Sequence, residues 1–371
     1  MTFVEAEKFF RFIRYAIGNE STPLTMSNKE WRKFFDFCQN QAVTGVAFEG
    51  ISKQKLPEAI GLPKDLLYKW ISICEQLKEL NKRCNKRCVE ITCFFHVRGF
   101  ESCILKGQGN AQMYPNPYSR NAGDIDIWVG GNRKEIVGII REKYPAVFEN
   151  YHHIDFPFFA DIPVEVHFTP GTLPRPKYNK RFQSYAKEHF EEEVNNIVCL
   201  YGEDEQVSVS TLKFNLIYQM AHMMVHFFDE GVGLRHFVDY YYVLKRSCIQ
   251  NVDFLDINDT LRYLGLEKFA NGVMWVEINY LGFNNKYLIG HPSPKIGSTI
   301  FHEMIEGGNF GQHDDRYGLR KYGYLGRGLA DTFRLLKLFS IFPSESLWKI
   351  IWKIRNQRWK IKSVITYRNW F

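Results

Sequence analysis

Two aspartates in a short alternating segment are the residues whose types and spacing point most directly to chemistry. Polar and apolar residues alternate in Gly123-Asp-Ile-Asp-Ile-Trp-Val129. If the segment is a strand, Asp124 and Asp126 project from one face and the isoleucines from the other. Two neighbouring carboxylates repel each other, so they need open water or a cation between them. Oxygen ligands of this kind favour Mg²⁺, which binds one or two carboxylates together with substrate phosphates.

A glycine-containing turn provides a place for such a phosphate. Leu105-Lys-Gly-Gln-Gly109 follows an apolar run and precedes residues 110–114, which have helical character. Glycines let the backbone approach a ligand closely, and the amides at a helix start attract an anion. A Gly-x-Gly alone is usually only a turn. Next to the aspartate pair, it predicts a phosphate held over the cation.

A third carboxylate makes the pattern more specific. Glu165 lies in the alternating segment Val164-Glu-Val-His-Phe168, after a turn at residues 160–163, and shares a face with His167. Three acidic positions on two neighbouring strands are much more specific than any of them alone. Lys106 offers a point charge to a triphosphate and Arg120 a planar fork, although either can also be a solvated basic residue.

These residues resemble a known family, the uncharacterised nucleotidyltransferases of the DNA polymerase β superfamily, which are widespread in bacteria. The resemblance covers about residues 95–245 and departs from the wider superfamily in having glutamine, not serine or glycine, after the loop glycine. Its motifs are Leu105-Lys-Gly107, Tyr114-Pro115, Arg120, Gly123-Asp-Ile-Asp-Ile127, His153, Val164-Glu-Val-His167, His222, His226, Gly231-Val-Gly-Leu-Arg235 and Asp239.

The resemblance implies an α+β fold (α/β mixed), with a polymerase-β-like nucleotidyltransferase core, a small mixed sheet and helical regions at both ends. It implies transfer of a nucleoside monophosphate from a nucleoside triphosphate to a hydroxyl of an unidentified acceptor, using Mg²⁺ or Mn²⁺ in a two-metal mechanism. The catalytic metal ligands would be Asp124, Asp126 and Glu165. The nucleotide- and phosphate-binding residues would be Lys106, Gly107, Gln108, Arg120, Gly123 and Arg235. The residues that support the metal ligands would be His153, His167 and Asp239.

Residues after position 220 leave alternatives open. His222 and His226 stand four apart on one helix face, which suits a metal, but buried or hydrogen-bonded histidines are favoured without a third ligand at a recognisable spacing. The resemblance puts Arg235 near phosphate, with Asp239 orienting it. A structural Arg235–Asp239 pair at i, i+4 explains the same two residues.

Stepwise changes in periodicity divide the chain of 371 residues into three regions. Residues 1–92 have helical periodicity, residues 93–203 alternate short strands and helices and form the nucleotidyltransferase core, and residues 204–371 return to helix. The hydrophobic content of 45% and the aromatic content of 16% exclude a disordered chain.

A basic, tryptophan-rich tail ends the chain. Residues 331–371 contain nine lysines or arginines and two acidic residues, and they account for the whole formal net charge of +7. The tail also holds Trp348, Trp352, Trp359 and Trp370. Such a helix can dock on the protein body, lie on an anionic membrane or contact nucleic acid, and nucleic acid is the least favoured of the three.

Location and redox state follow from what the sequence lacks. There is no apolar run of 18 residues, and acidic residues stand where a signal peptide has its basic start, so we expect a cytoplasmic protein. Docking of the tail on the protein body is the favoured alternative, and a peripheral contact at the inner membrane surface is the second. Eight cysteines without a Cys-x-x-Cys indicate reduced thiols. Two rivals remain, a catalytically degenerate nucleotide-binding protein and a membrane-surface accessory protein of polysaccharide biosynthesis.

Overall fold

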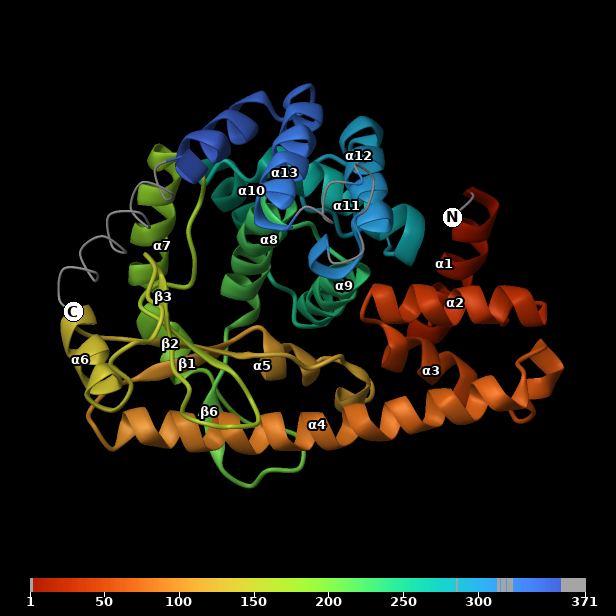
Figure 1. Ribbon diagram of the computed structural model, residues 1–371, viewed down its shortest axis with the longest axis horizontal. Coiled ribbons are helices and arrows are strands. Elements are labelled where there is room, and N and C mark those ends of the chain that lie inside the picture. The colour runs from red at the N-terminus through yellow and green to blue at the C-terminus, as the bar shows by residue number, and fades with distance from the viewer. Residues whose placement is uncertain (1–2, 285, 312–313, 315–317, 319–322, 355–371) are drawn as a thin grey trace.

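A computed structural model describes residues 3–284, 286–311, 314, 318 and 323–354 (Figure 1). It confirms the predicted α+β fold, with a small mixed sheet between helical regions. All eight cysteines are free thiols.

The first part of the chain is helical. Its elements are α1 (Phe3–Ile17), α2 (Asn28–Asn40), α3 (Thr44–Ser52), the 3₁₀ turn η1 (Pro57–Ile60) and α4 (Lys64–His96). A capping box, in which Ser27 and Glu30 satisfy each other's backbone amides, starts α2. Helix α4 has no glycine or proline over 33 residues, so it continues for about 50 Å along the base of the molecule (Figure 1).

A four-stranded sheet lies above one end of α4. The elements of this part are β1 (Ser102–Leu105), α5 (Gly107–Ala111), η2 (Pro117–Ser119), β2 (Ile125–Val129), α6 (Arg133–Lys143), β3 (His153–Asp155) and β4 (Val164–His167). The strand order is β1-β2-β4-β3, in which β2 and β4 are parallel and the other two pairs antiparallel. The two strands that carry the predicted carboxylates are therefore neighbours.

Alternation along β2 and β4 separates the two faces of this sheet. Ile127 and Val166 pack into one core with buried residues of α4 such as Cys88. On the opposite face, the Trp128 ring stacks on Phe214 of helix α8 (Leu212–Asp229). The polar residues of both strands share this second face, so they point toward the helices that follow in sequence.

Helices also dominate the last part of the chain. Its elements are α7 (Pro176–Asn195), β5 (Ile197–Cys199), β6 (Gln206–Ser208), α8 (Leu212–Asp229), α9 (Leu234–Ile249), α10 (Phe254–Tyr263), α11 (Glu267–Leu281), α12 (Pro294–Gly307), η3 (Asn309–Gly311) and α13 (Gly323–Phe339). Residues 343–354 are also helical. Helices from both ends of the chain share one apolar core, in which Phe10 of α1 packs on Tyr280 of α11.

The start of α8 is fixed by two residues. Thr211 caps the helix, and its backbone amide and hydroxyl each donate a 2.7 Å hydrogen bond to the buried carboxyl of Glu193. Burial raises the pKa of Glu193 to about 7, although the bonds from Thr211 oppose the shift.

The predicted three-region division stays a prediction. Helix α4 crosses the position 92/93, and β5 pairs with β6 across position 203. None of the described helices combines the length and the apolar character that crossing a membrane requires.

The described part of the basic tail docks on the body of the protein. Lys349 is 3% exposed and contacts Asp229 of α8, and Arg334 donates to the Phe227 carbonyl oxygen at 2.7 Å. Residues 355–371, with Trp359 and Trp370, lie outside the described residues.

Candidate functional site

The β2–β4 register brings the predicted carboxylates together. Asp126 and Glu165 are direct partners in the parallel pairing, and Asp124 immediately precedes β2. Asp126 is only 3% exposed, whereas Asp124 is open to solvent and Glu165 is partly so. Three carboxylates thus meet at one edge of a pocket, at different depths.

Two cationic groups surround Asp126. Lys106 Nζ lies 3.0 Å from Asp126 Oδ2, and His167 Nε2 lies 2.9 Å from Asp126 Oδ1. Burial opposes ionisation of Asp126, but the charge of Lys106 and the hydrogen bond from His167 outweigh it and lower the pKa of Asp126. The same contacts act on their partners. They raise the pKa of Lys106, and they raise that of His167 to about 9 against the effect of burial.

Asp124 has the opposite electrostatic environment. The negative charge of Asp126 raises the pKa of Asp124, and partial desolvation adds to the effect. Attraction by Lys106 and Arg235 only partly offsets this repulsion. Asp124 is therefore the carboxylate that gains most from an added cation.

Three histidines gather at the edge of the sheet beside Glu165. Strand β3 pairs with β4 so that His153 is the partner of His167. His153 Nδ1 lies 3.2 Å from Glu165 Oε2 and 3.1 Å from His152 Nε2, and His167 Nε2 lies 3.4 Å from the same Glu165 oxygen. The predicted supporting residues His153 and His167 thus contact Glu165. Burial lowers the pKa of His152 to about 2, which keeps this imidazole neutral.

The glycine-containing turn adopts an unusual backbone conformation. Lys106 has φ +40° and Gly107 φ +43°, so a non-glycine residue occupies a region that costs energy for an L-amino acid. A Cβ at Gly107 would meet no atom within 4 Å, which leaves the loop open to a ligand. The sequence pattern indicated helix over 110–114, but α5 begins at Gly107, directly after the strained residue.

The Gln108 side chain does not reach the pocket, contrary to its predicted contact with phosphate. It is buried and turns toward α4, where its Nε2 lies 3.3 Å from Asn81 Oδ1 and close to Asn85 Oδ1. Asn81 and Asn85 are one helical turn apart, so they form a polar notch that accepts the amide. Gln108 fixes the turn to α4, and only its backbone stays near the pocket.

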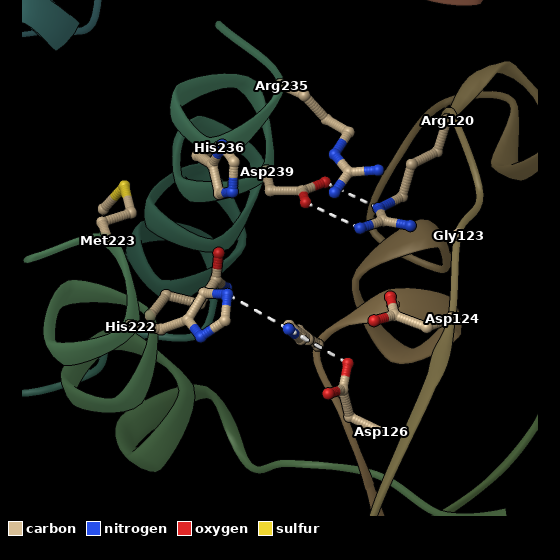
Figure 2. Close-up of a pocket in the computed structure, with 12 residues that line it drawn as sticks. Arg120, Gly123, Asp124, Asp126, His222, Met223, Arg235, His236 and Asp239 are labelled. Carbon is tan, nitrogen blue, oxygen red and sulfur yellow. Dashed lines mark hydrogen bonds and ion pairs between the residues drawn. The ribbon is translucent and has the colours of Figure 1, made fainter. Parts of the chain in front are cut away.

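Helix α8 forms the wall opposite the carboxylates. His222 Nε2 lies 3.1 Å from Lys106 Nζ, and a dashed line marks this contact in Figure 2. Burial lowers the pKa of His222, His226 and His236 well below the ordinary histidine value. The groups of potential metal ligands among the described residues do not include His222 or His226, and both side chains are partly buried.

Of the two alternatives for Arg235 and Asp239, the structure does not show the structural i, i+4 pair, because Asp239 binds Arg120 instead. Arg120 donates from Nε and Nη2 to the two Asp239 oxygens at 2.8 and 2.9 Å (Figure 2). The buried Tyr114 hydroxyl donates to Asp239 Oδ1 at 2.6 Å. The Arg120 side chain is 4% exposed. This bidentate pair links the segment before β2 to α9. Arg120 also lines the pocket, so its contact with phosphate stays a prediction.

Arg235 faces the pocket from the start of α9. Its Nη1 donates to the Asn121 carbonyl oxygen at 3.2 Å, and its guanidinium lies over the Phe310 ring. Arg235 Nε has no hydrogen-bond partner among the described residues. A Cβ added at Gly123 would lie 3.7 Å from Nη1, so glycine there leaves space between Arg235 and the backbone before Asp124.

Two adjoining pockets meet at Lys106 and the aspartates. One lies between the carboxylates and the arginines, and the other, which is larger, lies between Glu165, the β3–β4 histidines and α8. Asp124, Asp126, Lys106 and His222 line both pockets, so they occupy the junction.

Comparison with known proteins identifies the family. A model described as "Uncharacterised nucleotidyltransferase" matches residues 27–281, which include every predicted site residue. The chain belongs to this family. Membership of a nucleotidyltransferase family implies that the substrate is a nucleotide.

Other similarities are distant. A solved structure titled as an antigenic nucleotidyltransferase-like protein from Paracoccidioides brasiliensis aligns with 43% of this chain and 75% of its own, at 11% identity and a TM-score of 0.27. A likeness this weak carries no argument. No curated protein matches the chain.

Sequence reasoning missed several residues that shape the site. Tyr114 belonged to a motif, but the sequence assigned it no role. Asn81 and Asn85 lie in a region predicted only to be helical, and Phe310 lies in one predicted only to be polar. Asn81 and Asn85 at i, i+4 on a predicted helix were a detectable signal. Phe310 lies in a loop far along the chain, and no local pattern marks it.

Proposed function

We propose that the protein transfers a nucleoside monophosphate from a nucleoside triphosphate to a hydroxyl of a small or macromolecular acceptor. One observation carries the proposal. Within the family-matched residues, Asp124, Asp126 and Glu165 line pockets that also hold Lys106 and Arg235. Acidic groups for divalent ions and basic groups for phosphates therefore adjoin at one junction.

The donor set suits divalent ions such as Mg²⁺ or Mn²⁺, because three carboxylates supply hard oxygen ligands. Asp124, Asp126 and Glu165 would hold them. When bound, such ions neutralise the triphosphate and stabilise the entering and leaving oxygens of an in-line displacement.

Protein groups supply the remaining functions. Lys106 and Arg235 bind and orient the triphosphate, with backbone access at Gly107 and Gly123. Arg120 and Asp239 hold the segment before β2 in place, so that Asp124 keeps its position. Glu165 faces the larger pocket and can take the proton of the acceptor hydroxyl, which assigns the donor to the arginine side and the acceptor to the histidine side.

Binding of the donor tests this proposal. ATP, GTP, CTP and UTP are titrated calorimetrically into the full-length protein with Mg²⁺ and with EDTA. We expect metal-dependent binding of at least one nucleotide, with a large loss of affinity in Asp124→Asn. The matched control, Asp204→Asn, removes one exposed carboxylate in the β5–β6 turn and should bind like the wild type.

Two outcomes would contradict the proposal. If no nucleotide binds in either condition, the donor assignment fails. If a nucleotide binds with metal but no nucleotidyl product forms with any hydroxyl acceptor in a broad screen, the protein is the degenerate nucleotide-binding form of its family.

We also propose a peripheral membrane contact on the same molecule. An apolar stripe on α13, formed by Leu329, Phe333 and Leu336, is at least half exposed and is called the α13 stripe below. The residues follow helical spacing, so they form one face. Because residues 331–371 account for the formal net charge of +7, we expect an anionic lipid surface to be the partner of the α13 stripe.

A further inference from the structure

Ligand-type atoms converge on one point beside β4. His167 Nε2 lies 2.9 Å from Asp126 Oδ1 and 3.4 Å from Glu165 Oε2, and His153 Nδ1 lies 3.2 Å from the same Glu165 oxygen. One atom from each of Asp126, Glu165 and His167 lies within 4.8 Å of the others, and the same holds for His152, His153 and His167. Nitrogen and oxygen donors therefore share a single small volume.

Hydrogen bonds within this group do not satisfy all of its polar atoms. One N–H on His167 Nε2 can point at one carboxylate at a time, yet oxygens of two carboxylates lie near it. His167 is 4% exposed, and its Nδ1 has no hydrogen-bond partner among the described residues. A metal ion in place of the Nε2 proton would contact both carboxylates at once, which a single N–H cannot do.

The separations match the edges of a coordination polyhedron. With metal–ligand bonds of about 2.0–2.2 Å, neighbouring ligands lie about 2.9–3.1 Å apart around an octahedral ion and about 3.3–3.6 Å apart around a tetrahedral one. The three measured separations, 2.9, 3.2 and 3.4 Å, fall in or between these ranges. The spacing of His167 from Asp126 and from Glu165 therefore suits ligands of one ion, and His153 contacts the same Glu165 oxygen.

We propose that Asp126, Glu165 and His167, with His153 at its rim, form a nitrogen-containing site for a first-row transition-metal ion such as Mn²⁺ or Zn²⁺, bound in preference to Mg²⁺. Imidazole nitrogen suits these ions, whereas Mg²⁺ takes oxygen ligands and keeps its waters. His167 becomes a direct ligand rather than a supporting residue.

The two ion positions of the proposed transferase then differ in chemistry, and this step rests on the proposed function. Asp124 lies on the arginine side of the junction, where carboxylate and phosphate oxygens would surround an ion that arrives with the triphosphate. The site with His167 lies on the other side, facing the larger pocket. The protein would then hold a resident transition-metal ion on the acceptor side, and an exchangeable Mg²⁺ would arrive with the donor.

Metal binding without nucleotide tests the inference. Metal-free full-length protein is titrated with Mn²⁺ in a large excess of Mg²⁺, and bound Mn²⁺ is followed by electron paramagnetic resonance. We expect one Mn²⁺ to bind despite the Mg²⁺, with nitrogen couplings from imidazole in the pulsed spectrum. In His167→Gln and His153→Gln those couplings should weaken, and the former should raise the Mn²⁺ Kd about tenfold or more.

Controls separate this inference from the proposed function. His291→Gln removes an exposed histidine far along the chain and should leave the Mn²⁺ Kd and spectrum unchanged. Asp124→Asn should keep the nucleotide-free Mn²⁺ signal while losing binding of triphosphate with Mg²⁺. The circular dichroism spectrum of His167→Gln is first compared with that of the wild type. If the variant does not fold, the presence or absence of nitrogen couplings in the spectrum of the wild-type protein tests the inference.

Each outcome has a distinct meaning. Mn²⁺ without nitrogen couplings, or displaced by Mg²⁺ at comparable concentration, overturns the inference even if triphosphate binds. Nitrogen-coupled Mn²⁺ without any triphosphate binding supports the inference and overturns the proposed function instead.

Discussion

Neutralising Asp124 and neutralising Asp126 should change stability in opposite directions. Asp126 is buried between Lys106 and His167, whereas Asp124 is exposed and repelled by Asp126. In metal-free protein we therefore expect Asp126→Asn to be destabilising and Asp124→Asn to be neutral or slightly stabilising. Both variants should lose metal-dependent triphosphate binding.

The magnitude follows from the ion pair. At a separation of 3.0 Å between Lys106 Nζ and Asp126 Oδ2, the Coulomb attraction is about 5 kcal/mol at an effective dielectric constant of 20. Desolvation cancels part of it, and removing one partner of a buried pair typically costs about 3–5 kcal/mol. Asparagine keeps a hydrogen-bond acceptor, so we expect about 3 kcal/mol for Asp126→Asn. Asp124→Asn should stay within about 1 kcal/mol of the wild type, because solvent screens this side chain.

Urea unfolding in EDTA, followed by tryptophan fluorescence at pH 7, measures both free energies of unfolding. The pH dependence of the free energy of unfolding adds a second check, because the direction of the pKa shift sets the sign of that dependence. The lowered pKa of Asp126 means that its stabilising contribution is present above the ordinary aspartate pKa and is lost as the pH falls below it. An Asp126→Asn variant that is as stable as Asp124→Asn would refute the reasoning.

Three further predictions follow from other contacts. Arg235→Ala should weaken triphosphate binding about tenfold to a hundredfold in calorimetry with little change in Tm, whereas Arg120→Ala should lower the free energy of unfolding by about 3–5 kcal/mol, because it leaves Asp239 buried and unpaired. Equal effects of the two substitutions would contradict this. The pKa of Glu193 is raised to about 7 from an ordinary value of 4.5, so its stabilising contribution is complete below pH 4.5 and is lost as the pH rises toward 7. Relative to Glu193→Gln, wild-type stability in urea should fall by about 1.4 kcal/mol per pH unit in that window, and a flat difference would be the contrary result. Serine substitution of the whole α13 stripe should abolish co-sedimentation with anionic vesicles at low salt while keeping the Tm, and retained binding would exclude the stripe as the contact.

Local patterns in the sequence were enough to predict the carboxylate geometry. Alternation along residues 123–129 and 164–168 placed Asp126 and Glu165 on one face of their strands. Because these two strands are neighbours in the sheet, the two residues lie side by side. The fold class and the family followed from the same motifs and are confirmed. The roles of the site residues stay predictions.

Long-range contacts could not be predicted from the sequence. The partner of Arg120 lies 119 residues away, and the contact between Lys106 and His222 spans 116 residues. Local spacing instead favoured Arg235 with Asp239, since i, i+4 pairs are the contacts that a helix makes by itself. Gln108 was misjudged for a related reason, because its partners lie on a helix that precedes it by more than 20 residues.

The Arg120–Asp239 link has a consequence for how the chain is made. Domains fold from the N-terminus during synthesis, so β1 and β2 leave the ribosome well before α9 exists. Until residue 239 emerges, Arg120 lacks its counter-charge and the segment before Asp124 has no anchor on the helical side. Chains that terminate earlier would expose the apolar surface that α8 and α9 cover, which makes them substrates for chaperones and proteases rather than partially active fragments. Assembly of the pocket is thereby delayed until most of the polypeptide has been synthesised.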